Sequence, residues 1–296
     1  MLVIIGALIT ALTIQQPAEP RARTPQTDQT VSVARGARLI VSNFAGEVMI
    51  RTWEKDAVRV QAHHSSRARV NIETVPAGVS VSASGSVGPA TVDYAITAPA
   101  WMAVKVNGTY NFVSVEGTQN EISAETVRGD IAVKGGGGAV TAKSVEGEVT
   151  IDGVRGRITA ESVNESIKIT NSSGEITAET INGGITLTGI DSSSVDVATV
   201  NGSIVYEGVI ADSGKYRLTT HNGDITVGVA ETSNATFTIR THNGQFSPTL
   251  PVKRVGEAQR GRRAVFTLGN GSAEVELESF GGTIRLRGAE RGRTRK

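Results

Sequence analysis

One short phrase recurs through the middle of this chain, and its repetition constrains the fold more than any other feature of the sequence. The phrase is Thr or Ser, a bulky residue, usually Asn, usually Gly, and then an alternation of apolar residues. Its copies begin at residues 126, 144, 162, 180, 199, 220 and 241, so they return every 18 to 21 residues. A period of this size with apolar alternation is typical of coils that stack on one another as a β-solenoid.

Each repeat supplies two short strands, one before the phrase, as in residues 176–180, and one after it, as in residues 185–187. Alternate residues of both strands are apolar or small, so one row of each strand is expected to point inward. A single coil cannot bury both rows, and neighbouring coils must complete the core. No proline occurs between Pro99 and Pro248, so no ladder hydrogen bond is lost to proline there.

Stacking of the coils predicts columns of like residues. The Asn of the phrase then forms a structural ladder, and its members are Asn164, Asn182, Asn201, Asn222 and Asn243. Side-chain amides in such a column can satisfy one another and the turn backbone, and the Asn-Gly pairs suit a left-handed backbone at the corner. An antiparallel sandwich of hairpins is the alternative. It explains the alternation and the turns, but not the return of identical residue types at one register.

The segments on both sides of the repeats continue as β structure without the period. We predict that residues 36–103 cap the solenoid of residues 104–247 at its N-terminal end and that residues 248–287 cap the other end, because terminal coils must not expose an open edge. Residues 19–35 are predicted to be a linker, and residues 288–296 a basic tail without order.

The N-terminal segment points to export. Residues 2–14 are apolar and uncharged, and their length suits the hydrophobic part of a secretory signal better than a membrane span. Residues 1–18 are therefore predicted to be a signal peptide or, if uncleaved, an N-terminal membrane anchor. In either case we expect the rest of the chain to be extracytoplasmic, in the periplasm, on the cell surface or secreted. The absence of cysteine excludes disulfides and thiolate metal sites.

A basic loop is the strongest candidate for an interaction site. The net charge of only +1 argues against a nucleic-acid-binding surface over the whole molecule. Basic residues nevertheless gather in one segment, at Lys253, Arg254, Arg260, Arg262 and Arg263. They could hold an anionic polymer through screened charge attraction. The alternative is a solvated loop without a ligand.

Two pairs of side chains could carry chemistry, but each pair has a simpler structural explanation. His221 and His242 stand one repeat apart and could ligate a metal with Asp224 nearby. The same position in the other copies holds Val or Ile, so an imidazole that fills a widened corner explains them without a metal. Asp130 and Glu148 could act as a glycosidase pair, although two solvated carboxylates after a turn explain them as well. We therefore predict no catalytic residue, no metal site and no cofactor.

The order of the segments resembles a known family. LIVSNFAGEVMIRTWEKDAVRVQA (39–62), VDYAITAPAWMAVKVNG (92–108) and the tandem G-[DE]-[IV]-x-[VI] coils that follow resemble the DUF4097 family over roughly residues 36–287. Its members are β-strand-repeat proteins often labelled adhesins, related to head domains labelled as autotransporter adhesins. The resemblance implies an exported protein folded as a right-handed β-helix. It offers no catalytic residues to transfer to this chain.

The sequence therefore favours an exported, non-catalytic β-solenoid that acts as an adhesin-like or cell-envelope scaffold and binding protein. Its expected partner is a cell-surface polysaccharide or another envelope protein, with no nucleic acid, and a membrane only through an uncleaved N-terminal segment. A carbohydrate-active β-helix enzyme is one alternative, which a groove lined by carboxylates and aromatics would favour. A filament-forming envelope scaffold is the other, which needs exposed terminal coils. The oligomeric state is not predicted.

Overall fold

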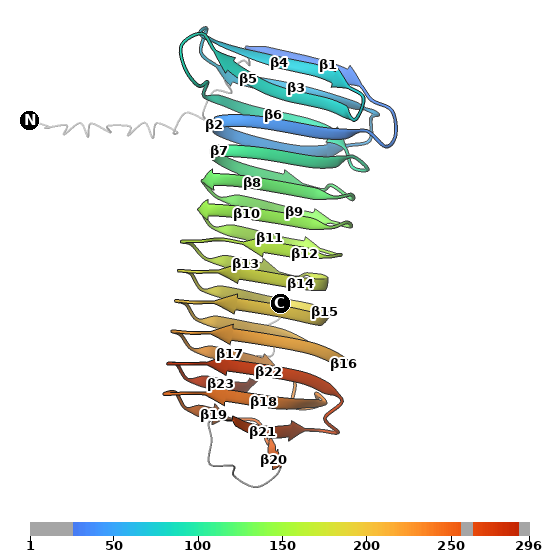
Figure 1. Ribbon diagram of the computed structural model, residues 1–296. Coiled ribbons are helices and arrows are strands. Elements are labelled where there is room, and N and C mark those ends of the chain that lie inside the picture. Colours follow the sequence, from blue (N-terminus) through green and yellow to red (C-terminus); the bar gives the residue numbers. More distant parts are fainter. Residues whose placement is uncertain (1–25, 256–262, 290–296) are drawn as a thin grey trace, which may run out of the picture.

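The computed structural model describes residues 26–255 and 263–289. The predicted signal or anchor segment, residues 19–25 of the predicted linker, Arg260, Arg262 and residues 290–296 lie outside this described part. Within it the chain is all-β, with strands β1 to β23. No helix long and apolar enough to cross a membrane occurs among the described residues. Figure 1 shows the strands stacked one above another along a single long axis.

Two ladders of parallel strands form the body of the stack. The first ladder comprises β8 (Ile122–Arg128), β10 (Val140–Glu146), β12 (Ile158–Glu161), β14 (Ser173–Thr180) and the second halves of β15 (Ile185–Thr199) and β16 (Ile204–Thr220). The second ladder comprises β9 (Ile131–Gly136), β11 (Val149–Val154), β13 (Ile167–Thr170), the first halves of β15 and β16, and β17 (Ile225–Val229). The recurring phrase carries the chain from the first ladder to the second, and we call this turn the corner.

Equivalent residues of successive copies lie directly on one another. Ile185 pairs with Ile204, and the side-chain amide of Asn201 donates to Oδ1 of Asn182 at 2.9 Å. An antiparallel sandwich is therefore excluded for the repeat region. The core lies between the inward rows of the two ladders, where side chains such as Ile158 and Ile167 are fully buried. The predicted inward rows are confirmed, because strict alternation sends every second side chain to the interior.

The N-terminal segment joins the ladders in an order that differs from the order of the chain. Its strands are β1 (Thr27–Ser32), β2 (Arg38–Trp53), β3 (Ala57–His64), β4 (Ala68–Val75), β5 (Gly78–Gly85), β6 (Val92–Pro99) and β7 (Ala103–Glu116). β2 pairs in parallel with β7 on one side and with β5 and β6 on the other. After β2 the chain thus forms the outer strands β3 to β6, and β7 then pairs with the opposite edge of β2. β1, β3 and β4 pair antiparallel and end the stack. Residues 27–32, which were predicted to belong to a linker, are therefore a paired strand, because their backbone groups bond to β3.

The strands of the C-terminal segment also stack in an order that differs from their order in the chain. Its strands are β18 (Ala235–Thr241), β19 (Phe246–Pro248), β20 (Lys253–Val255), β21 (Arg263–Leu268), β22 (Ala273–Ser279) and β23 (Ile284–Gly288). β22 lies between β16 and β18, and β23 lies between β17 and β19 (Figure 1). The segment predicted as a C-terminal cap therefore supplies an interior coil, while residues 235–248 form an outer one. Antiparallel β20 and β21 follow β18 at this end.

Charge pairs between neighbouring coils favour this order. Arg285 of the inserted coil binds Asp224 at 2.6 Å on its inner side. On its outer side Arg240 contacts both Glu276 and Glu278. The Arg285 guanidinium also lowers the pKa of Asp224 below its ordinary value. Opposite charges on neighbouring strands stabilise a sheet and like charges destabilise it, so these partly exposed pairs add modestly to the stability of this order.

Cysteine cross-linking tests this order, because the chain has no cysteine of its own. Thr219 is the partner of Glu278, and Glu278 is the partner of Arg240. We expect the T219C/E278C variant to form a disulfide on mild oxidation, since a strand spacing of about 4.8 Å lies within the disulfide range. The T219C/R240C variant, with its cysteines roughly 10 Å apart, should stay reduced. Peptide mass mapping gives the readout, and the reverse pattern would mean that β18 follows β16 directly.

Candidate functional site

A column of glycine residues lets successive corners approach each other closely. A Cβ atom on Gly183 would lie 2.1 Å from the carbonyl oxygen of Glu165, and one on Gly202 would lie 1.9 Å from that of Gly183. Gly129 has a φ of 121°, but Gly183 and Gly202 do not adopt a positive φ. The prediction of a left-handed backbone is therefore wrong for these two Asn-Gly pairs. Glycine is needed there because a side chain would collide with the neighbouring backbone.

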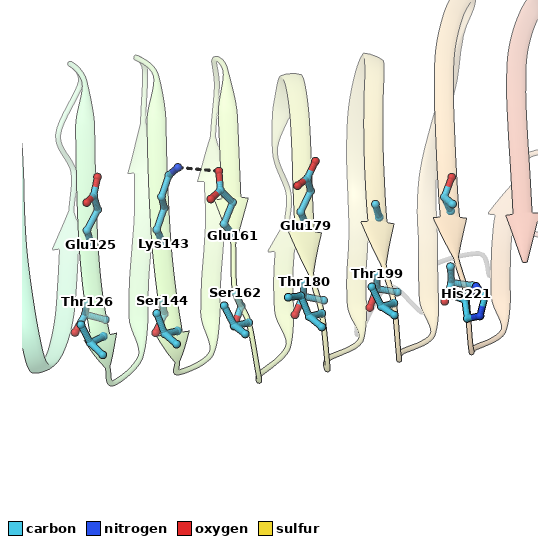
Figure 2. A pocket seen from close by; sticks show the side chains of 18 of the residues that line it. Glu125, Thr126, Lys143, Ser144, Glu161, Ser162, Glu179, Thr180, Thr199 and His221 are labelled. Atoms are coloured by element: carbon cyan, nitrogen blue, oxygen red, sulfur yellow. Dashed lines mark ion pairs between the residues drawn. The ribbon is translucent and has the colours of Figure 1, made fainter.

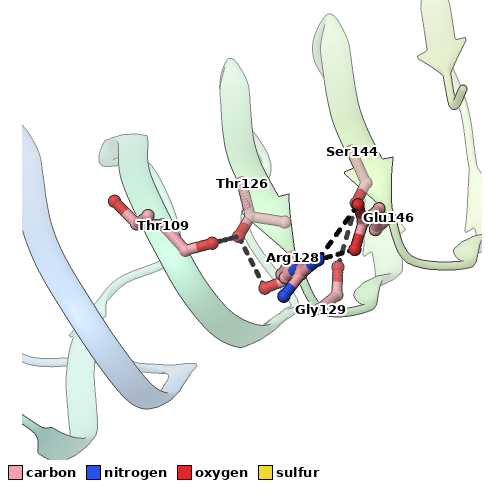
Figure 3. A network of polar contacts seen from close by, with 6 residues as sticks. All are labelled: Thr109, Thr126, Arg128, Gly129, Ser144 and Glu146. Carbon is pink, nitrogen blue, oxygen red and sulfur yellow. Dashed lines mark hydrogen bonds and ion pairs between the residues drawn. The ribbon is translucent and has the colours of Figure 1, made fainter.

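A row of buried hydroxyl groups precedes the corners. This hydroxyl row consists of Thr126, Ser144, Ser162, Thr180, Thr199, Thr220 and Ser279. The Oγ of Ser144 donates to the carbonyl oxygen of Gly129 at 3.0 Å (Figure 3). The equivalent bond recurs from Ser162, Thr180, Thr199, Thr220 and Ser279 to the corner of the coil before. The row thus satisfies its own buried hydroxyls and joins each coil to its neighbour.

The asparagine ladder lies at the exposed edge of the corners. The Nδ2 groups of Asn182, Asn201 and Asn222 each donate to the Oδ1 of the member before at 2.9–3.0 Å, which links them to Asn164. Asn243 does not belong to this ladder. The inserted coil places Gly281 beside Asn222, and the backbone N–H of Asn243 donates to Phe280. In the two coils before Asn164 the same column holds Arg128 and Glu146, which form an ion pair (Figure 3).

The bulky residue of each corner points outward, and these residues form an apolar ridge along the stack. The apolar members of the ridge are Val127, Val145, Val163, Ile181, Val200 and Phe280, and at the corner between Val200 and Phe280 the same position holds His221, which also lines the groove. Apart from Val163, which is half-buried, these apolar members are 39–47% exposed. The interpretation that this position fills the corner is therefore wrong. Alternation could have revealed the ridge, because Ala124 and Thr126 point inward and Val127 must then point outward.

His221 and His242 are separated by Phe280. The phenyl ring stacks on both imidazoles, with centroids 4.7 Å from His221 and 4.4 Å from His242 and interplanar angles of 12° and 15°. The two histidines cannot share a metal ion, because the phenyl ring occupies the space between them. Among residues 26–255 and 263–289, no group of three or more His, Cys, Asp and Glu side chains is placed to hold a metal.

A groove of about 920 Å³ runs beside the ridge, from Asn107 in β7 to Phe280 after β22. The ridge forms one wall and the hydroxyl row forms the floor. The opposite wall, which we call the rim, consists of Glu125, Lys143, Glu161, Glu179, Ala198, Thr219 and Glu278. Figure 2 shows rim and floor residues side by side on successive strands. With eight strands about 4.8 Å apart, the groove is roughly 34 Å long.

The rim is acidic, with four carboxylates and one ammonium group. The Nζ of Lys143 binds Glu161 at 2.8 Å (Figure 2). The Glu161 carboxylate raises the pKa of Lys143, and the charges of Glu125 and Glu179 act in the same direction. An ammonium group is stabilised where the surrounding field is negative. Because Lys143 pairs with Glu161 and Arg240 pairs with Glu278, a cation that enters the groove meets chiefly the carboxylates of Glu125 and Glu179.

Asp130 and Glu148 lie outside the groove, just after their corners. The Oδ1 of Asp130 accepts the backbone N–H of Glu148 at 2.8 Å. Asp224 stands at the equivalent position and accepts the backbone N–H of Thr283 at the same distance. A carboxylate at this position therefore links one coil to the next, which is a structural role. It is not placed opposite a second carboxyl group with a substrate between them, as a glycosidase pair would be.

The predicted basic loop is partly a β-hairpin at the end of the stack. Lys253 and Arg254 belong to β20, and Arg263 begins β21, which pairs with it in antiparallel orientation. These three side chains are exposed and do not line the groove. Arg260 and Arg262 lie outside the described residues. The structure therefore brings together only part of the predicted basic site and places it apart from the groove.

The comparison with protein-family models confirms the family resemblance. A family model described as Toastrack DUF4097 matches residues 37–287. Among solved structures, that of a "putative cell adhesion protein" from Clostridium sporogenes is similar, with 11% identity, a TM-score of 0.25, and coverage of 88% of this chain and 98% of that chain. None of the curated proteins matches the chain.

Proposed function

Because this chain belongs to the Toastrack DUF4097 family, we propose that it is an exported, non-catalytic β-solenoid with an adhesin-like role that binds another envelope component through the groove. The groove itself carries this proposal, since the ridge, floor and rim positions recur on seven successive strands from β8 to β22. A catalytic site brings different groups together at one point. A surface that repeats along its length instead fits an elongated partner.

The chemistry of the groove supports binding rather than reaction. The floor hydroxyls of Ser144 and Thr199 already donate to corner carbonyls, so no base is placed to activate them as nucleophiles. Exposed apolar side chains that line up over a long distance are typical of interaction surfaces. The ridge has this character, with Ile181 and Val200 near its centre.

The finer description of the fold is part of this proposal. We propose coils of 18–21 residues that wind in a right-handed sense. Partner residues such as Val140 and Ile158, 18 positions apart, and Ile204 and Ile225, 21 positions apart, support the coil length. The right-handed sense follows from the strong preference of parallel crossover connections for that hand.

Retention of coated beads tests the binding function. Beads that carry the full chain should adhere to intact bacterial cells in a saturable way. The Ile181→Lys variant should lose most of this retention, because it places a charge in the middle of the ridge. The matched control is Val209→Lys, which changes an exposed valine outside the groove and should retain full adhesion. Equal retention of the two variants would rule out the groove as the binding surface.

Two further readouts address the rival functions. Release of reducing ends from a panel of cell-wall and capsular polysaccharides would overturn the non-catalytic part of the proposal and favour a carbohydrate-active enzyme. A sedimentation coefficient that rises steadily with concentration would favour a filament-forming scaffold.

A further inference from the structure

We propose that the groove binds a basic amphipathic α-helix of a partner protein, laid along the axis of the stack. This inference rests on the proposed function and names the class of partner that the same groove takes. It follows from the aliphatic character of one wall, the acidic character of the other and the spacing of the coils.

The ridge favours a protein partner over a carbohydrate. From Val127 to Val200 the ridge members are all Val or Ile. Sugar rings stack on aromatic side chains, which this stretch of the wall lacks. Branched aliphatic side chains pack well against Leu, Ile or Met side chains of another protein, and burial of such surfaces drives association. The central part of the groove therefore fits an apolar protein face.

The rim favours a cationic partner. Glu125 and Glu179 are exposed and lie on either side of the ion pair between Lys143 and Glu161. The pKa of Lys143 is raised first by its hydrogen bond to Glu161, and the charges of Glu125 and Glu179 act in the same direction. A Lys or Arg side chain that enters the groove meets the negative field of these charges, whereas an anionic wall polymer is repelled by it. Charge complementarity thus selects a partner with basic residues beside its apolar face.

The spacing along the groove selects a helix over an extended chain. The four steps from Val127 to Val200 cover roughly 19 Å at the spacing of parallel strands. Four turns of an α-helix cover roughly 22 Å, while four same-face repeats of an extended strand cover roughly 27 Å. Flexible side chains can take up a mismatch of about 2 Å but not one of about 8 Å, so one apolar residue per helical turn can meet one ridge residue per coil.

Strand addition is a poor fit for the same surface. A peptide that extends a sheet needs unpaired backbone groups at a sheet edge. Along the groove, β8 is paired with β7 and β10, and β12 is paired with β10 and β14. The partner must therefore bind through side chains, as a helix in a groove does.

A synthetic peptide of about 21 residues, or six helical turns, is the probe. It carries Leu at every third or fourth position and Lys on both flanks of the Leu face, and its binding to the full chain is measured by fluorescence anisotropy. We expect saturable binding that weakens as salt is added. Ile181→Lys should weaken it by about tenfold or more, while Val209→Lys should leave it unchanged. The double variant E125Q/E179Q should weaken it about threefold at low salt and reduce its salt dependence.

Matched peptides and one measurement without peptide define the results that would overturn the proposal. Equal binding by a peptide with Glu in place of Lys would reject the charge argument. Equal binding by a peptide with two central prolines, or by a scrambled peptide, would reject the helix. If the chain alone forms dimers that Ile181→Lys dissociates, the groove is a contact between two copies and not a helix-binding site.

The results also separate this inference from the proposed function. Bead retention that depends on Ile181 without any peptide binding would reject the helix and leave the groove as an envelope-binding surface. Peptide binding that depends on Ile181 without bead retention would support the helix-binding site and remove the adhesin-like role.

Discussion

Replacement of Leu277 by alanine is expected to lower the free energy of unfolding by about 3 kcal/mol. Leu277 is fully buried, and its neighbours in the ladder are Leu218 of β16 on one side and Ile239 of β18 on the other. The truncation leaves a cavity with a coil on each side of it. Neither coil can collapse into this cavity without breaking its own ladder bonds, so most of the cavity remains.

Urea denaturation measures this loss, and hydrogen exchange locates it. Each coil contacts only its neighbours, so amide protection should fall in β16, β18 and β22 and persist in β10. The control is Val255→Ala at an exposed position of β20, with an expected change within about 0.5 kcal/mol. A loss below about 1 kcal/mol for L277A would mean that one side of Leu277 is open to solvent, as in a terminal cap.

Replacement of Gly183 by alanine is expected to lower the free energy of unfolding by about 2–3 kcal/mol. The added Cβ would lie 2.1 Å from the carbonyl oxygen of Glu165 and 2.5 Å from its carbonyl carbon. Both atoms belong to the backbone of the neighbouring corner, so the two coils must move apart and weaken the ladder bonds around them. Urea denaturation of the full chain provides the measurement.

The adjacent glycine supplies a control in the same corner. A Cβ on Gly184 would meet only the carbonyl oxygen of Ser203, at 3.3 Å, and neighbouring coils carry Ser166 and Ser203 at this position. Gly184→Ala should therefore change stability by less than about 1 kcal/mol. Similar losses at Gly183 and Gly184 would contradict the collision as the cause. Glu165 occupies the position of Gly183 in the coil before, so that corner accommodates a side chain where the others have glycine. The collision expected at Gly183 is therefore specific to its own corner.

The register of the ladders was predictable from the sequence. Side-chain alternation with a period of two and a recurring phrase admit one alignment, in which Ile185 lies on Ile204 and Asn182 lies on Asn201. A slip of one residue would turn the whole apolar row of a strand to solvent. The cost of exposing that row is the physical reason why the pattern and the structure agree.

The candidate site was predictable only in part. The outward direction of Val127 and Ile181 follows from the same alternation. The ridge that these residues form can be recognised only when the coils are aligned with one another. The sequence analysis preferred the basic loop because a cluster of charged residues can be recognised in a sequence. A groove cannot be recognised in this way, because no particular residue type marks it. The groove is lined by Glu125, Lys143 and their equivalents on successive coils, so it exists only once the coils are stacked.

The sequence by itself determined the repeating unit, with its two strands, its inward rows and its glycine corner. Only the tertiary structure decided the order in which the units stack, because every copy presents similar backbone edges and apolar rows and can pair with any other copy. Contacts between side chains far apart in the chain contribute to that choice, as the ion pair of Asp224 with Arg285 does. The same choice brings Phe280 between His221 and His242 and extends the groove by one coil.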